Sequence, residues 1–227
     1  IGPGEKVALL GQSGVGKTTI MKLLLCYSDP NDGAILIDGH KMIDLDRKSW
    51  LQMIGYISQQ IVIWNGSIRD NLLYYLGKEK GEFSDDRLWE IMKILQIDFG
   101  NRLNEGLDTM VGEKGLKLSG GEAQRLSIGA AVIKNPKIMI IDEATNSLDA
   151  STEKLTWSGM EKILTRERSA LIITHRLNTV RELCHKFIML NSNGEGTYVE
   201  AITSNFEELK EKSETFRKLA VDQGIIL

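Results

Sequence analysis

The sequence predicts an α/β fold with a mostly parallel central sheet. Four short apolar runs are typical of strands covered on both faces, and they occupy residues 7–10, 54–57, 138–141 and 171–174. Segments with helical periodicity separate them, as at 18–25 and 123–132. Because strands that alternate with helices pair in parallel, these observations indicate a parallel sheet with helices on its faces.

Length and composition restrict the class of protein. The 227 residues suffice for one compact domain with a large insertion, or for two closely packed subdomains. Hydrophobic residues make up 42% and charged residues 26%, as in ordinary soluble globular proteins. A net charge of −3 argues against general nucleic-acid binding, so we expect no nucleic-acid partner. No apolar stretch approaches the ~18 residues of a membrane-spanning helix.

Two further features concern the protein's context. The chain opens on Ile1 rather than methionine and shows no signal peptide, so we expect a fragment of a longer protein. Cys26 and Cys184 lack the spacing of metal or redox sites. They are therefore predicted to be buried or partly buried thiols in a reducing compartment.

The first predicted strand runs into a phosphate-binding loop. Its glycines allow backbone N–H groups to wrap phosphates, Lys17 places a charge near the β and γ positions, and the Thr18 hydroxyl can bind Mg²⁺. The alternative is a glycine turn with a solvated lysine, which the preceding strand and following helix disfavour. The residues predicted to bind nucleotide here are Gly11, Gln12, Ser13, Gly14, Val15, Gly16, Lys17, Thr18 and Thr19.

The other three predicted strands also end in polar residues, which are Gln59, Asp142 with Glu143, and His175. Ligands collect at the carboxyl ends of parallel strands, so we expect these residues beside the phosphate loop. Asp142 can then bind Mg²⁺, and Glu143 can polarise the attacking water. Gln59 can join the metal or the water through its amide oxygen, and His175 can hydrogen-bond a γ-phosphate oxygen. Taken singly, each could instead be a solvated or structural residue.

Between residues 61 and 115 the pattern changes to that of amphipathic helices. We therefore expect a helical subdomain inserted between strands of the sheet. Asn65-Gly66-Ser67 matches a glycosylation sequon, but Ser67 is better interpreted as the N-cap of a helix that begins at Ile68. Residues 206–222 are predicted to form surface helix. The apolar residues that recur at spacings of three and four in the insertion are Leu72, Leu73, Leu76, Leu88, Ile91, Met92, Leu95 and Ile97.

A second helix start is also suited to binding phosphate. Ser119 and Glu122 have the spacing of a capping box, in which each side chain satisfies a backbone N–H group of the first turn. Gly120 and Gly121 leave other N–H groups open to an anion, and the helix dipole adds positive charge. The alternative is a flexible helix entry that binds nothing. One domain would thus hold two phosphate-binding helix starts.

Over essentially its whole length, the chain resembles the nucleotide-binding domain of an ABC transporter. The resemblance implies a P-loop NTPase fold of the RecA-like type, with an inserted α-helical subdomain and an incomplete antiparallel β subdomain at the N-terminus. The implied ranges are 1–60 and 126–227 for the two parts of the core and 61–125 for the helical subdomain. The matching segments, in the family's order, are Gly11 to Thr18 (Walker A), Gln59 (Q-loop), Leu118 to Glu122 (signature), residues 138–143 (Walker B), Ser147 to Asp149 (D-loop) and His175 (H-loop).

The resemblance implies an ATPase that couples ATP hydrolysis to transport across a membrane, with ATP and Mg²⁺ as ligands. Thr18, Gln59 and Asp142 would hold the metal. Glu143 would be the general base, and His175 and Gln59 would sense the γ-phosphate and the metal. In this family two domains, identical or different, pack head to tail. The residues that would act across this interface are Ser119, Gly120, Gly121 and Glu122, which close over the other domain's nucleotide, and Asp149 at the dimer seam.

By the same resemblance, the second partner is a transmembrane domain on the same native chain. The protein would then lie at the cytoplasmic side of the inner or plasma membrane. Segments 64–71, 109–115 and 175–180 are similar to those of exporters. The aromatic residue that stacks on adenine in this family lies upstream of Walker A, so we expect nucleotide binding by this chain to be weakened.

The sequence departs from the family pattern at Asn146 and Ser147, where serine and alanine are usual, at His185, and over residues 191–201. Two alternative functions stay open at this point. One is an ABC-type ATPase of DNA maintenance or translation, and the other is a regulatory domain that binds nucleotide without hydrolysing it.

Overall fold

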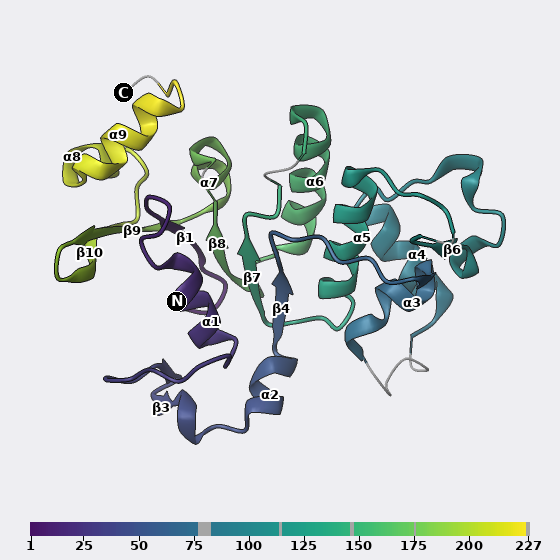
Figure 1. Cartoon of the computed structure of the whole chain (residues 1–227), viewed down its shortest axis with the longest axis horizontal. Helices are drawn as coiled ribbons and strands as arrows, with labels where there is room; N and C mark the ends of the chain where they lie inside the picture. Colours follow the sequence, from purple (N-terminus) through teal and green to yellow (C-terminus); the bar gives the residue numbers. More distant parts are fainter. Residues whose placement is uncertain (77–82, 114, 146–147, 175, 226–227) are drawn as a thin grey trace.

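The computed structural model describes residues 1–76, 83–113, 115–145, 148–174 and 176–225, and is built around a six-stranded sheet (Figure 1). The spatial order of the strands is β10-β9-β1-β8-β7-β4. The β9–β10 pair is antiparallel and every other neighbouring pair is parallel. The strands are β1 (Lys6–Leu10), β4 (Ile54–Ile57), β7 (Ile138–Asp142), β8 (Ser169–Ile173), β9 (Lys186–Asn193) and β10 (Gly196–Thr203).

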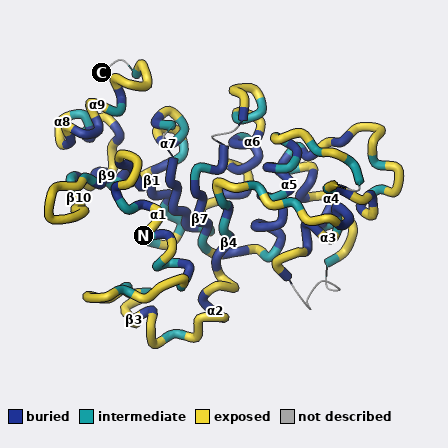
Figure 2. Tube along the Cα trace, viewed as in Figure 1, coloured by how far each residue is buried: buried dark blue, intermediate teal, exposed yellow. Residues whose placement is uncertain are grey.

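The four predicted strands are confirmed as β1, β4, β7 and β8, each within two residues of its predicted bounds. Their continuous apolar character reflects burial on both faces. In β1, Val7 and Leu9 belong to one hydrophobic cluster, whereas Ala8 and Leu10 belong to another. Because successive strand residues point to opposite faces, each such run supplies two cores at once. Figure 2 shows these strands as a buried centre between more exposed segments.

Helices cover both faces of the sheet. One face packs against α1 (Lys17–Leu24) through Met21 and against α2 (Arg47–Gln52) through Trp50. The opposite face packs against a second group of helices through residues such as Leu126, Met160 and Phe216. These helices are α5 (Gly120–Val132), α6 (Ala150–Ile163), α7 (Leu177–Leu183), α8 (Glu208–Lys212) and α9 (Glu214–Asp222).

The predicted helical insertion lies at one end of the sheet, beside α5 (Figure 1). Ser67 caps α3 as predicted, because its Oγ accepts a hydrogen bond from the backbone N–H of Asp70 at 3.0 Å. The Asp70 carboxylate accepts from the N–H of Ser67 in return. The elements here are β5 (Gly66–Ser67), α3 (Ile68–Leu72), α4 (Asp85–Ile94), the 3₁₀ turns η3 (Gly100–Arg102) and η4 (Gly106–Asp108), and β6 (Met110–Val111), which pairs antiparallel with β5.

In the N-terminal third, β2 (Leu36–Ile37) and β3 (His40–Lys41) form a separate antiparallel pair, followed by the 3₁₀ turn η1 (Met42–Asp44). The two thiols are confirmed as predicted, since Cys26 is half-buried and Cys184 is buried. Burial raises the pKa of the Cys184 thiol to about 12. Within the described part of the chain, none of the helices has the length and apolar character needed to span a membrane.

Candidate nucleotide-binding and catalytic site

The carboxyl ends of β1, β4, β7 and β8 meet at one cavity of about 310 Å³. Parallel pairing places these strand ends on the same edge of the sheet, as expected for an α/β ligand site. Position 175, the predicted H-loop histidine, lies outside the described residues. The cavity is lined by Ser13, Gly14, Gly16, Lys17, Thr18, Thr19, Gln59, Asp142, Glu143 and Ile173.

The phosphate loop adopts a conformation that requires glycine. Gly14 and Gly16 have φ angles of 79° and 97°, in the left-handed region that side chains rarely adopt. At Gly11 an added Cβ would lie 2.7 Å from Cγ1 of Val15 and 2.9 Å from the carbonyl oxygen of Leu190. The loop is therefore packed closely against β9 at Gly11, whereas a side chain at Gly14 would meet open space.

Lys17 already points into the loop. Its Nζ donates hydrogen bonds to the carbonyl oxygens of Gly11 at 2.7 Å and Gln12 at 2.9 Å. The residue is 6% exposed. Burial lowers the pKa of the ammonium, although the carboxylates of Glu143 and Asp142 oppose this shift. A phosphate oxygen would replace weak carbonyl partners with a charged one, so this cation is prepared for an anion.

The predicted metal-binding and catalytic residues lie at the same cavity. Asp142 is buried at the end of β7, whereas Glu143 is half-buried and Gln59 is exposed. Glu143 has a φ of 48°, which is uncommon for a residue with a side chain. Its backbone N–H donates to the carbonyl of Ile173 at 2.8 Å, which ties the turn after β7 to the end of β8. Strained backbone of this kind is often found at functional sites.

The predicted capping box at α5 is confirmed. The Oγ of Ser119 accepts from the N–H of Glu122 at 3.3 Å, and the Glu122 carboxylate accepts from the N–H of Ser119 at 2.8 Å. Arg102 forms an ion pair with Glu122. Burial alone would raise the pKa of the Glu122 carboxyl, but hydrogen bonds from Ser119 and the Arg102 guanidinium outweigh it, so the pKa is lowered.

The structure does not bring this helix start to the phosphate-loop cavity of its own chain, because none of residues 119–122 lines that cavity. Ser119 and Gly120 are exposed. An added Cβ at Gly120 would meet nothing within 4 Å, whereas one at Gly121 would lie 2.3 Å from Cγ2 of Thr152 in α6. Gly121 therefore permits close packing of two helix starts, and Gly120 faces open space.

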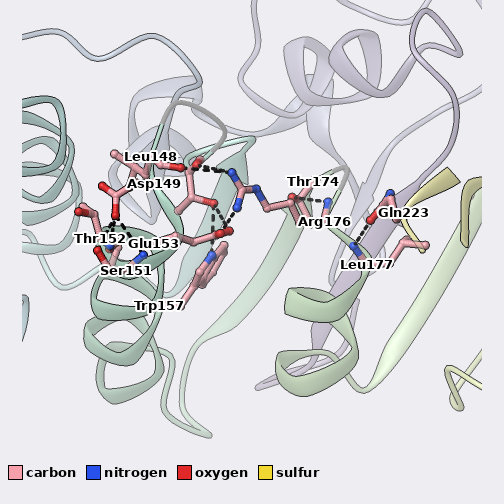
Figure 3. A network of polar contacts seen from close by, with 12 residues as sticks. Leu148, Asp149, Ser151, Thr152, Glu153, Trp157, Thr174, Arg176, Leu177 and Gln223 are labelled. Atoms are coloured by element: carbon pink, nitrogen blue, oxygen red, sulfur yellow. Dashed lines mark hydrogen bonds and ion pairs between the residues drawn. The ribbon is translucent and has the colours of Figure 1, made fainter. Parts of the chain in front are cut away.

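Asp149 is the N-cap of α6 (Figure 3). Its Oδ1 accepts hydrogen bonds from the backbone N–H groups of Ser151 and Thr152, each at 3.0 Å. The Ser151 hydroxyl also donates to Oδ1 at 2.5 Å. This side-chain hydrogen bond contributes most to lowering the pKa of the exposed Asp149 carboxyl, and the contacts from Thr152 add to it. Ser147, also predicted for the D-loop, lies outside the described residues.

Two groups near the site were missed by the sequence analysis. The hydroxyl of Thr197, in β10, donates to the carbonyl of Val15 in the phosphate loop at 2.9 Å. Arg176 forms an ion pair with Glu153 of α6 and contacts the chain just after β7 (Figure 3). Neither was assigned a role, although Arg176 lies within segment 175–180, which is similar to that of exporters. The one signal for Arg176 was its place next to His175.

Comparisons with known proteins show which family the chain is similar to. A model of the ABC transporter family matches residues 1–146. The chain is 38% identical over 179 residues to a multidrug resistance ABC transporter ATP-binding and permease protein of Lactococcus lactis, covering 78% of this chain and 30% of that protein. It is 39% identical over 230 residues to a mitochondrial potassium channel ATP-binding subunit of Rattus norvegicus, covering 98% of this chain and 30% of that protein.

Among solved structures, a bacterial Atm1-family ABC exporter with ATP bound superimposes with a TM-score of 0.84 and 34% sequence identity. That comparison covers 97% of this chain and 37% of the exporter chain. This chain therefore spans only 30% to 37% of the length of these relatives.

Proposed function

Because the chain belongs to the ABC transporter family, as an ATP-binding and ATP-hydrolysing domain of the exporter type, we propose that it binds and hydrolyses ATP in the cavity that contains Lys17 and Glu143. The observation that carries this proposal is the cavity itself, which gathers a buried cation, a hydroxyl, an amide and two carboxylates from three strand ends. Phosphoryl transfer requires mainly positioning and charge compensation, and this set supplies both.

The side chains present fit a magnesium ion. Thr18, Gln59 and Asp142 offer a hydroxyl, an amide oxygen and a carboxylate, which are the hard oxygen ligands that Mg²⁺ prefers. Among the described residues, no group of three or more His, Cys, Asp or Glu side chains could hold a metal. A metal here would therefore depend also on nucleotide oxygens and water, as is usual for Mg²⁺. When bound, it would neutralise charge on the β- and γ-phosphate oxygens.

Glu143 would act as the general base for hydrolysis. Its carboxylate accepts a proton from water while the water oxygen attacks the γ-phosphorus, and the bond from that phosphorus to the β–γ bridging oxygen breaks. ADP leaves with the bridging oxygen, and inorganic phosphate forms. Lys17 would exchange its loop carbonyls for phosphate oxygens as ATP binds, so its charge compensates the leaving group.

The test is the variant Glu143→Gln, which keeps size and hydrogen bonding but removes the base. ATP turnover should fall by roughly 10²- to 10⁴-fold, the usual contribution of general acid–base catalysis. ATP binding, measured by calorimetry, should persist. The control Glu161→Gln alters an exposed glutamate of α6 and should leave turnover unchanged. Undiminished phosphate release from Glu143→Gln would reject the proposed site.

The active form would be a head-to-tail dimer of this domain with a second copy or a related domain. Support comes from Ser119 and Gly120, which form an exposed helix start with N–H groups suited to phosphate yet outside the cavity of their own chain. Two domains can complete each other's sites only if this helix start closes over the partner's nucleotide. Asp149 would lie between the two sites.

The other partner would be a transmembrane domain, and the domain would then lie on the cytoplasmic side of its membrane. Support comes from relatives named as ATP-binding and permease proteins. Exposed aromatic residues, Tyr27 and Tyr75, border a cavity of about 190 Å³ beside Leu51 and Lys134. Apolar exposed surface of this kind is typical of contact sites. No observation favours DNA maintenance, translation or a non-hydrolysing role.

A further inference from the structure

A polar network joins the segment after β7 to the segment after β8, around Arg176 (Figure 3). The guanidinium of Arg176 forms an ion pair with Glu153 through Nη1. Its Nη2 donates to the backbone carbonyls of Thr145 and Leu148, each at 3.4 Å. One planar side chain thus contacts both ends of the loop between Glu143 and Asp149 and also the first turn of α6. Only arginine has donors arranged to reach several acceptors in this way.

The acceptor side of this network is fixed independently. The hydroxyl of Thr145 donates to the Glu153 carboxylate at 3.0 Å, and the indole Nε1 of Trp157 donates to the Thr145 hydroxyl at 3.3 Å. Thr145 is 2% exposed and Trp157 is 8% exposed. The carboxylate that receives Arg176 thus has a second hydrogen-bond donor in Thr145, which is itself held by Trp157, so the ion pair belongs to a connected network.

The chain on either side of position 175 is fixed as well. The hydroxyl of Thr174 accepts from the backbone N–H of Arg176 at 3.1 Å. The side chain of Gln223, at the end of α9, accepts from the backbone N–H of Leu177 at 3.1 Å. That N–H belongs to the first turn of α7, whose own N-cap residue supplies no side-chain hydrogen bond. The backbone N–H groups of Arg176 and Leu177 thus each have a defined hydrogen-bond acceptor.

We propose that Arg176 is a positioning residue for ATP hydrolysis, which holds Thr145 and Leu148, in the chain that follows Glu143, beside the end of β8 at Thr174. This inference rests on the proposed function, because it concerns the same cavity. Glu143 must be aligned with water and phosphorus in the transition state, and a misplacement of about 1 Å can cost ~100-fold in rate. Lys17 and the phosphate loop lie on other elements, so ATP binding does not depend on Arg176.

The test compares three variants of the network with one matched control. Arg176→Met removes the charge and donors but keeps the apolar stem. Arg176→Lys keeps a charge for Glu153 but loses the planar fork. Glu153→Gln removes the charge of the acceptor. The control Arg181→Met deletes an exposed ion pair to Glu207 from the same helix, α7, without touching the loop after β7.

We expect Arg176→Met to lower kcat by about 10- to 100-fold, the range set by misplaced reacting groups. The KM for ATP should change less than about twofold, since binding energy is retained. Arg176→Lys should restore part of the rate, and Arg181→Met should match the wild type. The double variant Arg176→Met/Glu153→Gln should lose no more than the worse single variant, because the two groups act together.

Equal changes in kcat and KM, or no recovery in Arg176→Lys, would assign Arg176 a role in general stability and overturn the proposal. So would wild-type turnover in Arg176→Met. If Arg176→Met fails to fold, the same comparison of kcat with KM applies to Glu153→Gln and Arg176→Lys. Failure of the proposed function is distinguishable, because in that case the wild-type protein itself would release no phosphate.

Discussion

At the scale of single residues, the site buries the Lys17 ammonium against backbone carbonyls of the phosphate loop. Burial disfavours the Lys17 ammonium, and its lowered pKa reflects this cost. Two loop carbonyls offset part of the cost without charge. The carboxylates of Glu143 and Asp142 offset a further part, and a triphosphate would add negative charge in direct contact with the ammonium. Nucleotide binding would therefore offset free energy that the burial of this ammonium costs the unbound protein. Such competition between function and stability is common.

The phosphate loop also depends on a residue far away in the sequence, Thr197. Its hydroxyl fixes the carbonyl of Val15, and an added Cβ at Gly16 would lie 3.4 Å from its Oγ1. Thr197→Val keeps the shape but removes the donor. We expect the KM for ATP to rise roughly 2- to 10-fold, which corresponds to the ~0.5–1.5 kcal/mol of one hydrogen bond. Steady-state kinetics measure this effect.

The matched control is Thr197→Ser, which keeps the hydroxyl and should bind ATP like the wild type. If the valine and serine variants bind ATP equally well, the contact between β10 and the loop does not shape the phosphate site.

Which site residues could be predicted from the sequence depends on the distance between partners along the chain. Lys17 and Thr18 follow their glycines directly. Asp142 and Glu143 end an apolar run, which pointed to them only in combination with the phosphate loop. Thr197 contacts Val15 across 182 positions. No periodicity or motif reports such a pair, because the contact exists only once β9 and β10 have folded beside β1.

At the scale of elements, strands buried on both faces were predictable and the edge hairpin was not. β7 and β8 are nearly fully buried along their length, so they read as continuous apolar runs. In β10 most residues are exposed, so its sequence lacks the continuous apolar run that marks the buried strands. The tail forms the surface helices α8 and α9, as expected, and it buries its apolar side through Phe206 and Phe216. The ring of Phe206 packs edge to face against Phe216 and against Phe187 of β9. Their partners lie on the hairpin that the sequence analysis missed.

Glycine stands at positions 120 and 121, at the start of α5, for two different physical reasons. Gly121→Ala would force its Cβ against Thr152, so we expect a loss of about 1–3 kcal/mol in the free energy of unfolding, as for overpacked cores. Gly120→Ala meets open space and should be neutral or stabilise the helix by up to ~1 kcal/mol. Its hydrolysis rate should nevertheless fall, because a methyl group would stand between the helix N–H groups and an approaching phosphate. Urea denaturation and phosphate release separate the two effects.

A second change can check the packing explanation. Gly121→Ala combined with Thr152→Ser removes the methyl group that Gly121 avoids, so stability should largely return. If the double variant is no more stable than Gly121→Ala alone, contact between α5 and α6 is not the reason for glycine at position 121.

At the scale of the whole molecule, the two phosphate-binding helix starts belong to different parts of the fold. The loop before α1 lines the cavity at the carboxyl ends of the strands, and none of residues 119–122 lines it. Helix α5 lies beside the helical insertion (Figure 1). A single chain therefore offers two half-sites that do not meet. The sequence could reveal both halves, because each is local. Only the family resemblance implied their separation, because that separation depends on how α5 packs on the sheet.

If the halves belong to one shared site, two inactive variants should restore each other. Lys17→Met removes the cation from one half. Gly120→Asp places a carboxylate at the other half, in open space and in a first helical turn that tolerates acids, so the fold should persist. Mixed dimers then contain one intact site. A random mixture should recover about a quarter of wild-type turnover, since half of the dimers are mixed and each has one of two sites. Phosphate release from each variant alone and from the mixture measures this recovery, and a mixture no more active than its parts would show that each chain works by itself.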